Sequence, residues 1–341
     1  MSERDLSRYA RQTILPQIGR EGQERLLASR AVVAGCGALG SMAANLLARA
    51  GVGRLRLIDR DFVELNNLQR QVLYDEGDVE EGLPKAAVAQ TRLSRVNSGI
   101  QVEGAVTDLN PSNVASLLGE ADVVVDAVDN FEARLLINDA AVKLGIPWVY
   151  GAVIGTYGLT MNIIPGVTPC LGCLFDAPPP AGEVETCATA GILAPVAAII
   201  SALQATEAIK ILIGSPDVRR GLLQVDAWDG EMELTAPARR QDCRTCVRHE
   251  YVYLNAESAS QTVSLCGQNA VQVVAQHGGR LDLKGLAHGL AATAEVKLNP
   301  FMLRILAEGY ELNVFPDARA IIKGTTDPTV ARALYSKYVG M

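Results

Sequence analysis

Two Cys-x-x-Cys pairs in this chain have the spacing of metal ligands: Cys170 with Cys173, and Cys243 with Cys246. Together they offer four thiolates, the ligand set of a tetrahedral structural Zn²⁺. The pairs are far apart in the sequence, so the ion would join two distant segments and leave no position for a catalytic water. A thioredoxin-like redox pair is disfavoured because neither pair opens a helix in a βαβ unit. The sequence therefore predicts a structural zinc site.

A fifth cysteine, Cys187, precedes the apolar segment that begins near Ile192. The N-terminus of a helix lowers a thiol pKa and raises the thiolate fraction, so Cys187 is a candidate nucleophile. The alternative, an inert cysteine at the junction of a loop and a helix, stays open. We expect the remaining cysteines, Cys36 and Cys266, to be packing residues.

Three glycines, Gly35, Gly37 and Gly40, form a G-x-G-x-x-G loop between an apolar strand and a helix. In that context the backbone can approach a phosphate, and the helix N-terminus favours negative charge. Asp59 ends the next strand, 59 − 40 = 19 residues after the last glycine. An acidic residue there accepts hydrogen bonds from ribose hydroxyls. Alone, the loop predicts an adenine nucleotide with NAD as the default, and a tight turn without a ligand remains the alternative.

Donors and cations follow the second strand, where Asn67, Arg70 and Lys85 come from two further segments. Such groups suit a triphosphate better than a dinucleotide, because they spread over several phosphate oxygens and offset developing charge. Solvated surface charges are the alternative for each of them taken singly.

Two acidic residues, Asp126 and Asp129, end a strand that is apolar throughout. A carboxylate at this edge can hold Mg²⁺, which keeps most of its waters and bridges phosphates. The alternative is helix capping, since Asp129 and Asn130 stand directly before a helical segment.

The elements that must position these residues alternate between strand and helix up to about residue 154, which predicts a doubly wound, mostly parallel α/β sheet. Beyond Gly155 the pattern favours antiparallel hairpin strands, with a long helix from Ile192 to about Leu212 between them. We expect a helical N-terminal arm over 1–30, the main domain with its zinc site over 31–250, and a small α+β module over 255–341.

Composition excludes several classes of protein. The 341 residues are 49% hydrophobic and 20% charged, and the formal net charge is −7. That balance is typical of a globular protein and gives no basic footprint for nucleic acid. The longest apolar stretch contains Glu207 and Lys210, which favours a buried helix over a membrane span. We expect a cytoplasmic protein, in which paired cysteines bind metal rather than form disulfides.

Several segments, taken together and in order, resemble the ThiF/MoeB/HesA group, whose bacterial members are E1-like enzymes that adenylate ubiquitin-like sulfur-carrier proteins. The resemblance covers roughly residues 5–250. It is carried by RYARQTILPQIGREGQERL, GCGALGS, LIDRDFVELNNLQRQ, LPKA, DAVDN, GAVIGTYGLTMNIIPGVTPCLGCLF, TCATAGILAP and LQATEAIK. One departure is Ala38, which replaces the second glycine of the GG pair in many members, and we expect it to crowd a phosphate only slightly.

The resemblance implies that a carrier's C-terminal Gly-Gly carboxylate attacks the α-phosphorus of Mg·ATP. It implies a ThiS-type carrier for thiamin thiazole synthesis, with a MoaD-type carrier for molybdopterin as the alternative and an NAD-dependent oxidoreductase less favoured. A homodimer and a separate sulfur donor are also expected. For the nucleotide, the resemblance implies ribose binding by Asp59, nucleotide binding by Gly35, Gly37 and Gly40, and phosphate contacts by Asn67, Arg70 and Lys85. For the metals, it implies Mg²⁺ binding by Asp129 and Zn²⁺ binding by Cys170, Cys173, Cys243 and Cys246. It further implies that Arg11 acts as an arginine finger from the partner subunit and that Cys187 forms a covalent link with the carrier.

Overall fold

The structure is a computed structural model that describes residues 7–175, 177, 190–255, 262–265, 269–273, 281–291 and 294–339. The chain divides into two compact units, Met1–Glu257 and Ser258–Met341. Cys187 and Cys266 lie outside the described residues, so the expectations for these two cysteines stay predictions.

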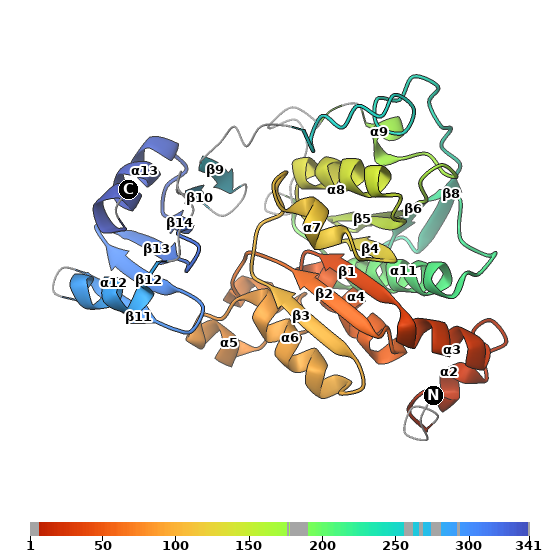
Figure 1. Ribbon diagram of the computed structural model, residues 1–341, viewed down its shortest axis with the longest axis horizontal. Coiled ribbons are helices and arrows are strands. Elements are labelled where there is room, and N and C mark those ends of the chain that lie inside the picture. Colours follow the sequence, from red (N-terminus) through yellow and green to blue (C-terminus); the bar gives the residue numbers. More distant parts are fainter. Residues whose placement is uncertain are drawn as a thin grey trace. The chain divides into compact units, whose positions relative to one another are not determined.

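The first unit is built on an eight-stranded sheet in the order β3-β2-β1-β4-β5-β6-β7-β8 (Figure 1). Strands β1 to β5 pair in parallel, and β6, β7 and β8 add antiparallel pairs. This confirms the predicted mostly parallel sheet with antiparallel additions. The strands are β1 (Arg30–Ala34), β2 (Arg54–Ile58), β3 (Gln101–Ala105), β4 (Val123–Asp126), β5 (Trp148–Ile154), β6 (Tyr157–Ile163), β7 (Leu222–Asp226) and β8 (Glu231–Thr235).

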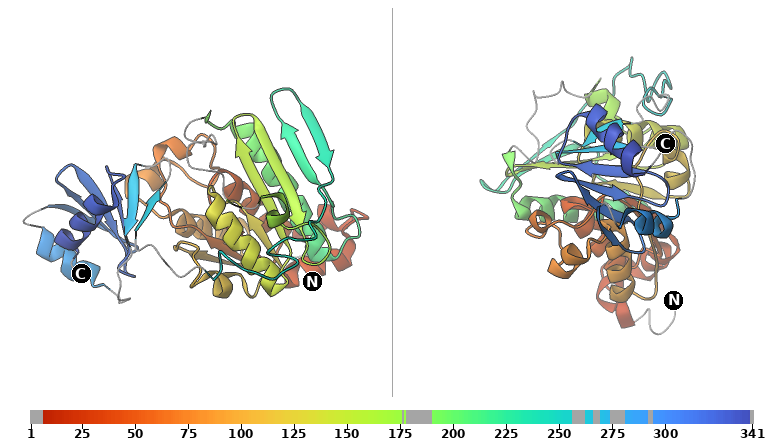
Figure 2. Two further views of the ribbon diagram at one scale, coloured as in Figure 1. Left: turned by 90° about the horizontal axis from the view of Figure 1, so that it is seen from above. Right: turned by 90° about the vertical axis from the view of Figure 1, so that its left-hand side faces the viewer.

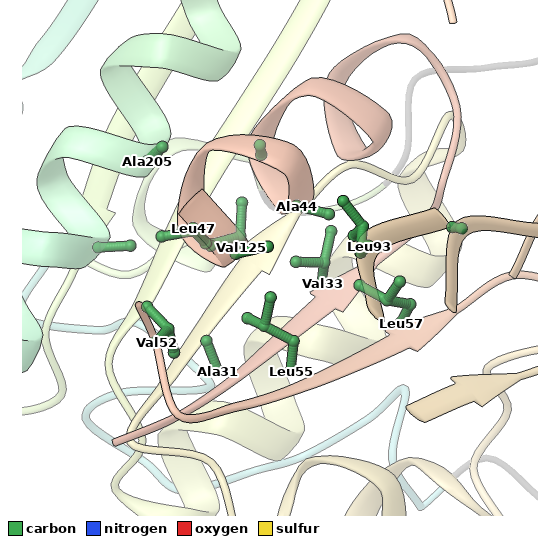
Figure 3. Packing of buried hydrophobic residues seen from close by; sticks show 14 of the residues in the cluster. Ala31, Val33, Ala44, Leu47, Val52, Leu55, Leu57, Leu93, Val125 and Ala205 are labelled. Atoms are coloured by element: carbon green, nitrogen blue, oxygen red, sulfur yellow. The ribbon is translucent and has the colours of Figure 1, made fainter. Parts of the chain in front are cut away.

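Helices cover both faces of this sheet. One face packs against α4, α6 and α11, and the other against α7 and α8. The alternation of buried residues along β1 shows why: Ala31 and Val33 face the first layer, and Val32 and Ala34 face the second. Figure 3 shows Val33, Leu55 and Leu57 packed beneath α4. The helices of the unit are α2 (Ala10–Thr13), α3 (Gly19–Ala28), α4 (Ala38–Ala50), η1 (Leu65–Asn67), α5 (Glu76–Glu81), α6 (Lys85–Val96), α7 (Val114–Leu118), α8 (Phe131–Leu144), α9 (Leu171–Leu174) and α11 (Ala194–Ile213).

Helix α11 begins two residues later than the sequence predicts and ends one residue later, at Ile213. By length and composition it could cross a membrane, but half of its apolar stretch is buried inside the structure. Its polar side chains bind the sheet: the Nε2 atom of Gln204 donates to the carbonyl of Asp126 at 2.7 Å. These contacts are those of a core helix.

The β7–β8 hairpin continues the sheet beyond β6 (Figure 2).

The second unit contains a six-stranded antiparallel sheet in the order β11-β12-β13-β14-β10-β9. Its core lies between one face of this sheet and two helices, α12 (Leu283–Leu290) and α13 (Pro328–Tyr338). The predicted small α+β module is therefore confirmed as a fold. Its strands are β9 (Thr262–Leu265), β10 (Ala270–Val273), β11 (Glu295–Leu298), β12 (Leu303–Ala307), β13 (Tyr310–Val314) and β14 (Ala320–Lys323).

Candidate functional site

The glycine loop lies directly after β1 at the carboxyl edge of the parallel strands. Gly35 has a φ of +95°, and a Cβ atom there would lie 2.4 Å from the carbonyl oxygen of Ala127. A Cβ on Gly40 would lie 1.8 Å from the carbonyl oxygen of Gly35. At Gly37 the nearest atom would be the Nε2 of Gln71, at 3.8 Å. Gly35 and Gly40 are thus required by packing within the protein, whereas a Cβ on Gly37 would make only an ordinary van der Waals contact.

Asp59, which follows β2, binds the loop directly. Its carboxylate accepts hydrogen bonds from the backbone N–H of Cys36 at 2.6 Å and of Asp61 at 2.7 Å. Burial, reinforced by the charge of Asp61, raises the pKa of Asp59 to about 6, although Lys85 and both hydrogen bonds act in the opposite direction. The predicted ribose-binding carboxylate therefore also fixes the backbone of the glycine loop.

Lys85 is the first residue of α6 and lies buried beside the same carboxylates. Its ammonium nitrogen is 3.2 Å from the Oδ2 of Asp61. Burial lowers the pKa of Lys85, but the charges of Asp61 and Asp59 outweigh that effect and raise it overall. Arg60 pairs with Asp108 at 2.9 Å on the same side. Arg60 and Asp61 were not predicted from the sequence, although the run Asp59-Arg60-Asp61 after a buried strand was the available signal.

Asp126 and Asp129, predicted as alternatives for a metal ligand, have different surroundings. Asp126 is buried at the end of β4, with its Oδ2 3.4 Å from the Nε of Arg134. Burial raises the pKa of Asp126 to about 6, although Arg134 lowers it. Asp129 is exposed, and its charge acts on both Lys85 and Arg60. Helix capping is performed by Asn130, whose Oδ1 accepts from the N–H of Ala133 at 2.8 Å.

Arg134 was also not predicted from the sequence, because its role depends on carbonyls of two other segments that the fold brings to it. Its Nη2 donates to the carbonyl of Val128 at 2.8 Å and to that of Gly151 at 3.2 Å. The guanidinium also lies over the rings of Phe131 and Tyr150 at 5.6 and 5.5 Å. Arg134 thereby fixes the loop that carries Asp129 to the neighbouring strand β5.

Asn67 and Arg70 lie on the segment that covers the glycine loop. Asn67 ends η1 and is buried, and its Oδ1 accepts from the N–H of Glu64 at 3.3 Å. Arg70 lines a cavity of about 290 Å³ together with Ala38 and Pro195, at the start of α4 and α11. Gln71, a residue that we missed, is only 4% exposed, and its Oε1 has no hydrogen-bond partner among the described residues.

Arg11 lies away from the glycine loop. It is exposed on α2, and residues on either side of it contact the C-terminal ends of α4 and α6. The Nε2 of Gln12 donates to the carbonyl of Ala50 at 2.8 Å, and the hydroxyl of Tyr9 accepts from the Nδ2 of Asn97 at 2.8 Å. Helices α4 and α6 begin at the edge that carries the glycine loop, so their C-termini mark the opposite edge. At about 1.5 Å per residue, helices of this length separate the two edges by roughly 20 Å.

Cys170, Cys173, Cys243 and Cys246 form a buried cluster. Their sulfur atoms all lie within 4.8 Å of one another. Individual separations are 4.0 Å for Cys170–Cys173, 3.6 Å for Cys170–Cys243 and 3.5 Å for Cys173–Cys246. Tetrahedral zinc with Zn–S bonds of about 2.3 Å places its sulfurs roughly 3.8 Å apart, so the four thiols fit the ion.

The thiols of the cluster differ in their pKa values. Burial raises the pKa of Cys173 to about 11 and raises that of Cys170 further, so the protein alone does not stabilise these two thiolates. Burial also acts to raise the pKa of Cys246, but hydrogen bonds, that of Arg239 foremost, lower it overall. Both cysteine segments are attached to α8: Asn138 accepts from the N–H of Leu171 at 2.9 Å, and Asp139 accepts from the hydroxyl of Thr245 at 3.0 Å. A metal here would join these segments to the helix that follows Asp129.

Comparison with known proteins agrees with this geometry. The family model described as the ThiF family matches residues 9–245. The chain is 43% identical over 336 residues to "Sulfur carrier protein ThiS adenylyltransferase" of Bacillus subtilis (strain 168), which covers 98% of this chain and 99% of that relative. It is 43% identical over 251 residues to "Sulfur carrier protein adenylyltransferase" of Thermus thermophilus, covering 72% and 92% of the two chains. A crystal structure of E. coli MccB with ATP is 25% identical with a TM-score of 0.57, covering 66% and 69%.

The family model spans more than half of the chain, and one relative matches it almost from end to end. The family predicted from the motifs is confirmed: the chain belongs to the ThiF family.

Proposed function

We propose that this chain uses ATP to adenylate the C-terminal Gly-Gly carboxylate of a ubiquitin-like sulfur-carrier protein. One observation carries the proposal: Asp59, Lys85 and Asp129 gather beside the glycine loop in a chain that is 43% identical over 98% of its length to a ThiS adenylyltransferase. The same relative favours a ThiS-type carrier, and hence sulfur incorporation into the thiazole of thiamin, over a MoaD-type carrier.

In this proposal the nucleotide lies along the glycine loop. Asp59 accepts hydrogen bonds from the ribose hydroxyls, and the phosphates lie beside Gly37, where a Cβ would meet no atom closer than 3.8 Å. Asn67, Arg70 and Lys85 contact phosphate oxygens, and the amide of Gln71, which faces Gly37, adds a further donor. The relative MccB, solved with ATP, supports ATP as a ligand of this fold.

The reaction needs charge neutralisation rather than a general base, because the attacking carboxylate is already ionised. A carboxylate oxygen of the carrier bonds to the α-phosphorus, and the bond from that phosphorus to the oxygen that bridges to the β-phosphate breaks. Pyrophosphate leaves and the carrier acyl-adenylate remains. Lys85, held charged by Asp61 and Asp59, offsets the negative charge that develops on the phosphates. Mg²⁺, held by Asp129, would supply a second positive charge there.

Arg11 completes the site from the partner subunit of a homodimer. Within one subunit, α2 lies at the edge of the sheet opposite to the glycine loop, so Arg11 cannot serve its own site. An arginine supplied in trans would stabilise the transferring phosphoryl group.

Zn²⁺ bound by Cys170, Cys173, Cys243 and Cys246 is structural in this proposal, since all four tetrahedral positions are protein sulfurs. Cys187 would form a covalent link with the carrier during sulfur transfer from a separate donor protein. We place the enzyme in the cytoplasm, where the five described free cysteines stay reduced.

The test is ATP–pyrophosphate exchange with purified carriers. Exchange should require a carrier that ends in Gly-Gly and should disappear when the last glycine is removed. A ThiS-type carrier should support it better than a MoaD-type carrier, and the reverse ranking would reassign the pathway. Tight binding of NAD with no exchange for either carrier would reject adenylation in favour of an oxidoreductase.

A further inference from the structure

Tyr74 connects two of the segments that surround the proposed nucleotide site. Its hydroxyl donates a hydrogen bond to the carbonyl oxygen of Cys36 at 2.8 Å, and it lies 3.4 Å from the carbonyl oxygen of Lys85. The side chain is 7% exposed and packs in the core beneath α4 and α6. A single buried hydroxyl thus lies between the glycine loop and the first residue of α6.

The hydrogen bond from Tyr74 to the carbonyl of Cys36 acts on the backbone of the glycine loop. Its N–H donates to Asp59, so its two backbone polar groups are held from two different directions. In a trans peptide the carbonyl of one residue and the N–H of the next point in opposite directions within one plane. Fixing the carbonyl of Cys36 therefore fixes the direction of the N–H of Gly37, the residue that caps α4. N–H groups at this position of a helix bind phosphate oxygens.

The second contact reaches Lys85 from the same oxygen. The backbone N–H of Lys85 donates to the carbonyl of Asp61 at 2.9 Å, and its ammonium lies beside the carboxylate of Asp61. Because the single proton of the Tyr74 hydroxyl is donated to Cys36, its oxygen only lies against the backbone from which the Lys85 side chain extends. Tyr74 also follows Asn67, Arg70 and Gln71 in the chain, so it belongs to the segment that supplies three of the proposed phosphate contacts.

We propose that Tyr74 is a positioning residue whose hydroxyl holds the glycine loop, beside the start of α6, in the geometry that binds the nucleotide. This inference rests on the proposed function, because it assumes that ATP lies along this loop. The hydroxyl makes no contact with the reacting atoms. Its loss would leave the buried carbonyl of Cys36 without its hydrogen bond and free the Gly37 peptide to rotate, which weakens phosphate binding without removing any phosphate contact.

The test compares two single-atom deletions, Tyr74→Phe and Tyr335→Phe, in the full chain. Tyr335 is the matched control: its hydroxyl is also buried and donates to a backbone carbonyl, that of Ala318, at 2.5 Å in the second unit. Binding of Mg·ATP is measured by titration calorimetry, and KM for ATP and kcat are measured by pyrophosphate exchange. Thermal unfolding and circular dichroism monitor the folding of each variant.

We expect Tyr74→Phe to raise both the dissociation constant and KM for ATP roughly three- to tenfold, in line with the loss of one buried hydrogen bond. Saturating ATP should restore kcat to near the wild-type value, which a misfolded variant would not show. Tyr335→Phe should lower thermal stability with unchanged ATP binding.

Unchanged ATP binding in Tyr74→Phe would overturn the proposal, and so would an equal loss in both variants. If the wild type binds ATP but shows no carrier-dependent exchange, adenylation is rejected, while the calorimetric comparison still decides the role of Tyr74. If the wild type does not bind ATP, both proposals fail.

Discussion

The ammonium of Lys85 lies 3.2 Å from the Oδ2 of Asp61, and the two side chains are only 7% and 19% exposed. Lys85 thus offsets a pair of neighbouring carboxylates that are themselves largely buried, and it is held charged in return. In a site of low dielectric, such a fixed charge acts strongly on developing phosphate charge and costs no reorganisation during the reaction.

Replacing Lys85 tests whether its charge offsets the charge that develops on the phosphates. Lys85→Met keeps the volume but removes the charge, so adenylation should fall by about 100-fold or more, as measured by pyrophosphate exchange. Lys210→Met is the matched control, because Lys210 pairs with the buried Glu207 at 2.7 Å on α11, outside the proposed site. Equal activity losses in the two variants would show that Lys85 acts through stability alone.

The raised pKa of Asp59 predicts a pH dependence of ATP binding. Protonation as the pH falls through about 6 removes an acceptor for ribose, so ATP affinity should weaken roughly tenfold between pH 7 and pH 5. Asp59→Asn should bind weakly at every pH and lose this step, whereas Asp126→Asn should keep it. Persistence of the step in Asp59→Asn, measured by calorimetry, would assign it to another group.

The free energy of unfolding should change with pH in the opposite sense to the affinity for ATP. The folded pKa values of Asp59 and Asp126, both about 6, lie above the ordinary carboxyl value of about 3.9. Between these values the folded state binds more protons than the unfolded state, so the contribution of these two groups falls as the pH rises from about 4 to 6. Chemical denaturation of Asp59→Asn should show a shallower decline over this window than the wild type, and an unchanged slope would contradict the assignment.

Metal content tests the cysteine cluster. The purified protein should carry about one zinc per chain by elemental analysis. Cys243→Ser should lose the metal and melt at a lower temperature, since removing one ligand leaves three buried thiols without their cation. Cys36→Ala should retain full zinc, because Cys36 lies in the glycine loop and outside the cluster. Wild-type protein without zinc, expressed in zinc-replete medium, would refute the site.

Subunit mixing tests Arg11. Arg11→Ala and Lys85→Met should each be inactive alone, because each lacks a part of every site. After mixing and subunit exchange, half of the dimers are mixed and each has one complete site, so about a quarter of wild-type activity should return. No recovery, despite dimers that exchange subunits by native mass spectrometry, would mean that Arg11 does not act in trans.

A variant of Cys187 separates activation from sulfur transfer. Cys187→Ala should keep full pyrophosphate exchange but form no thiol-sensitive conjugate with the carrier when a sulfur donor is present. Gel electrophoresis with and without reductant detects the conjugate. If the wild-type protein forms none under the same conditions, Cys187 has no covalent role.

The sequence predicted the features that depend on local spacing. The glycine loop, Asp59 and the two Cys-x-x-Cys pairs are each visible within a few residues, and the alternation of strands and helices predicted the sheet. It did not reveal Tyr74, Gln71 or Arg134, whose partners lie in other segments and come close only through the fold. It also could not show that Arg11 lies at the edge opposite to the glycine loop, because that depends on how α2 packs against α4 and α6.

The most direct test of the account is the chemical state of the carrier after one turnover. Intact mass spectrometry of a ThiS-type carrier, incubated with enzyme, magnesium and ATP plus pyrophosphatase, should show one added AMP on the terminal glycine. The adduct should be absent with Asp129→Ala enzyme and with a carrier that lacks its last glycine. Unmodified carrier in the presence of folded, ATP-bound wild-type enzyme would contradict the central claim that this site activates a protein's C-terminus.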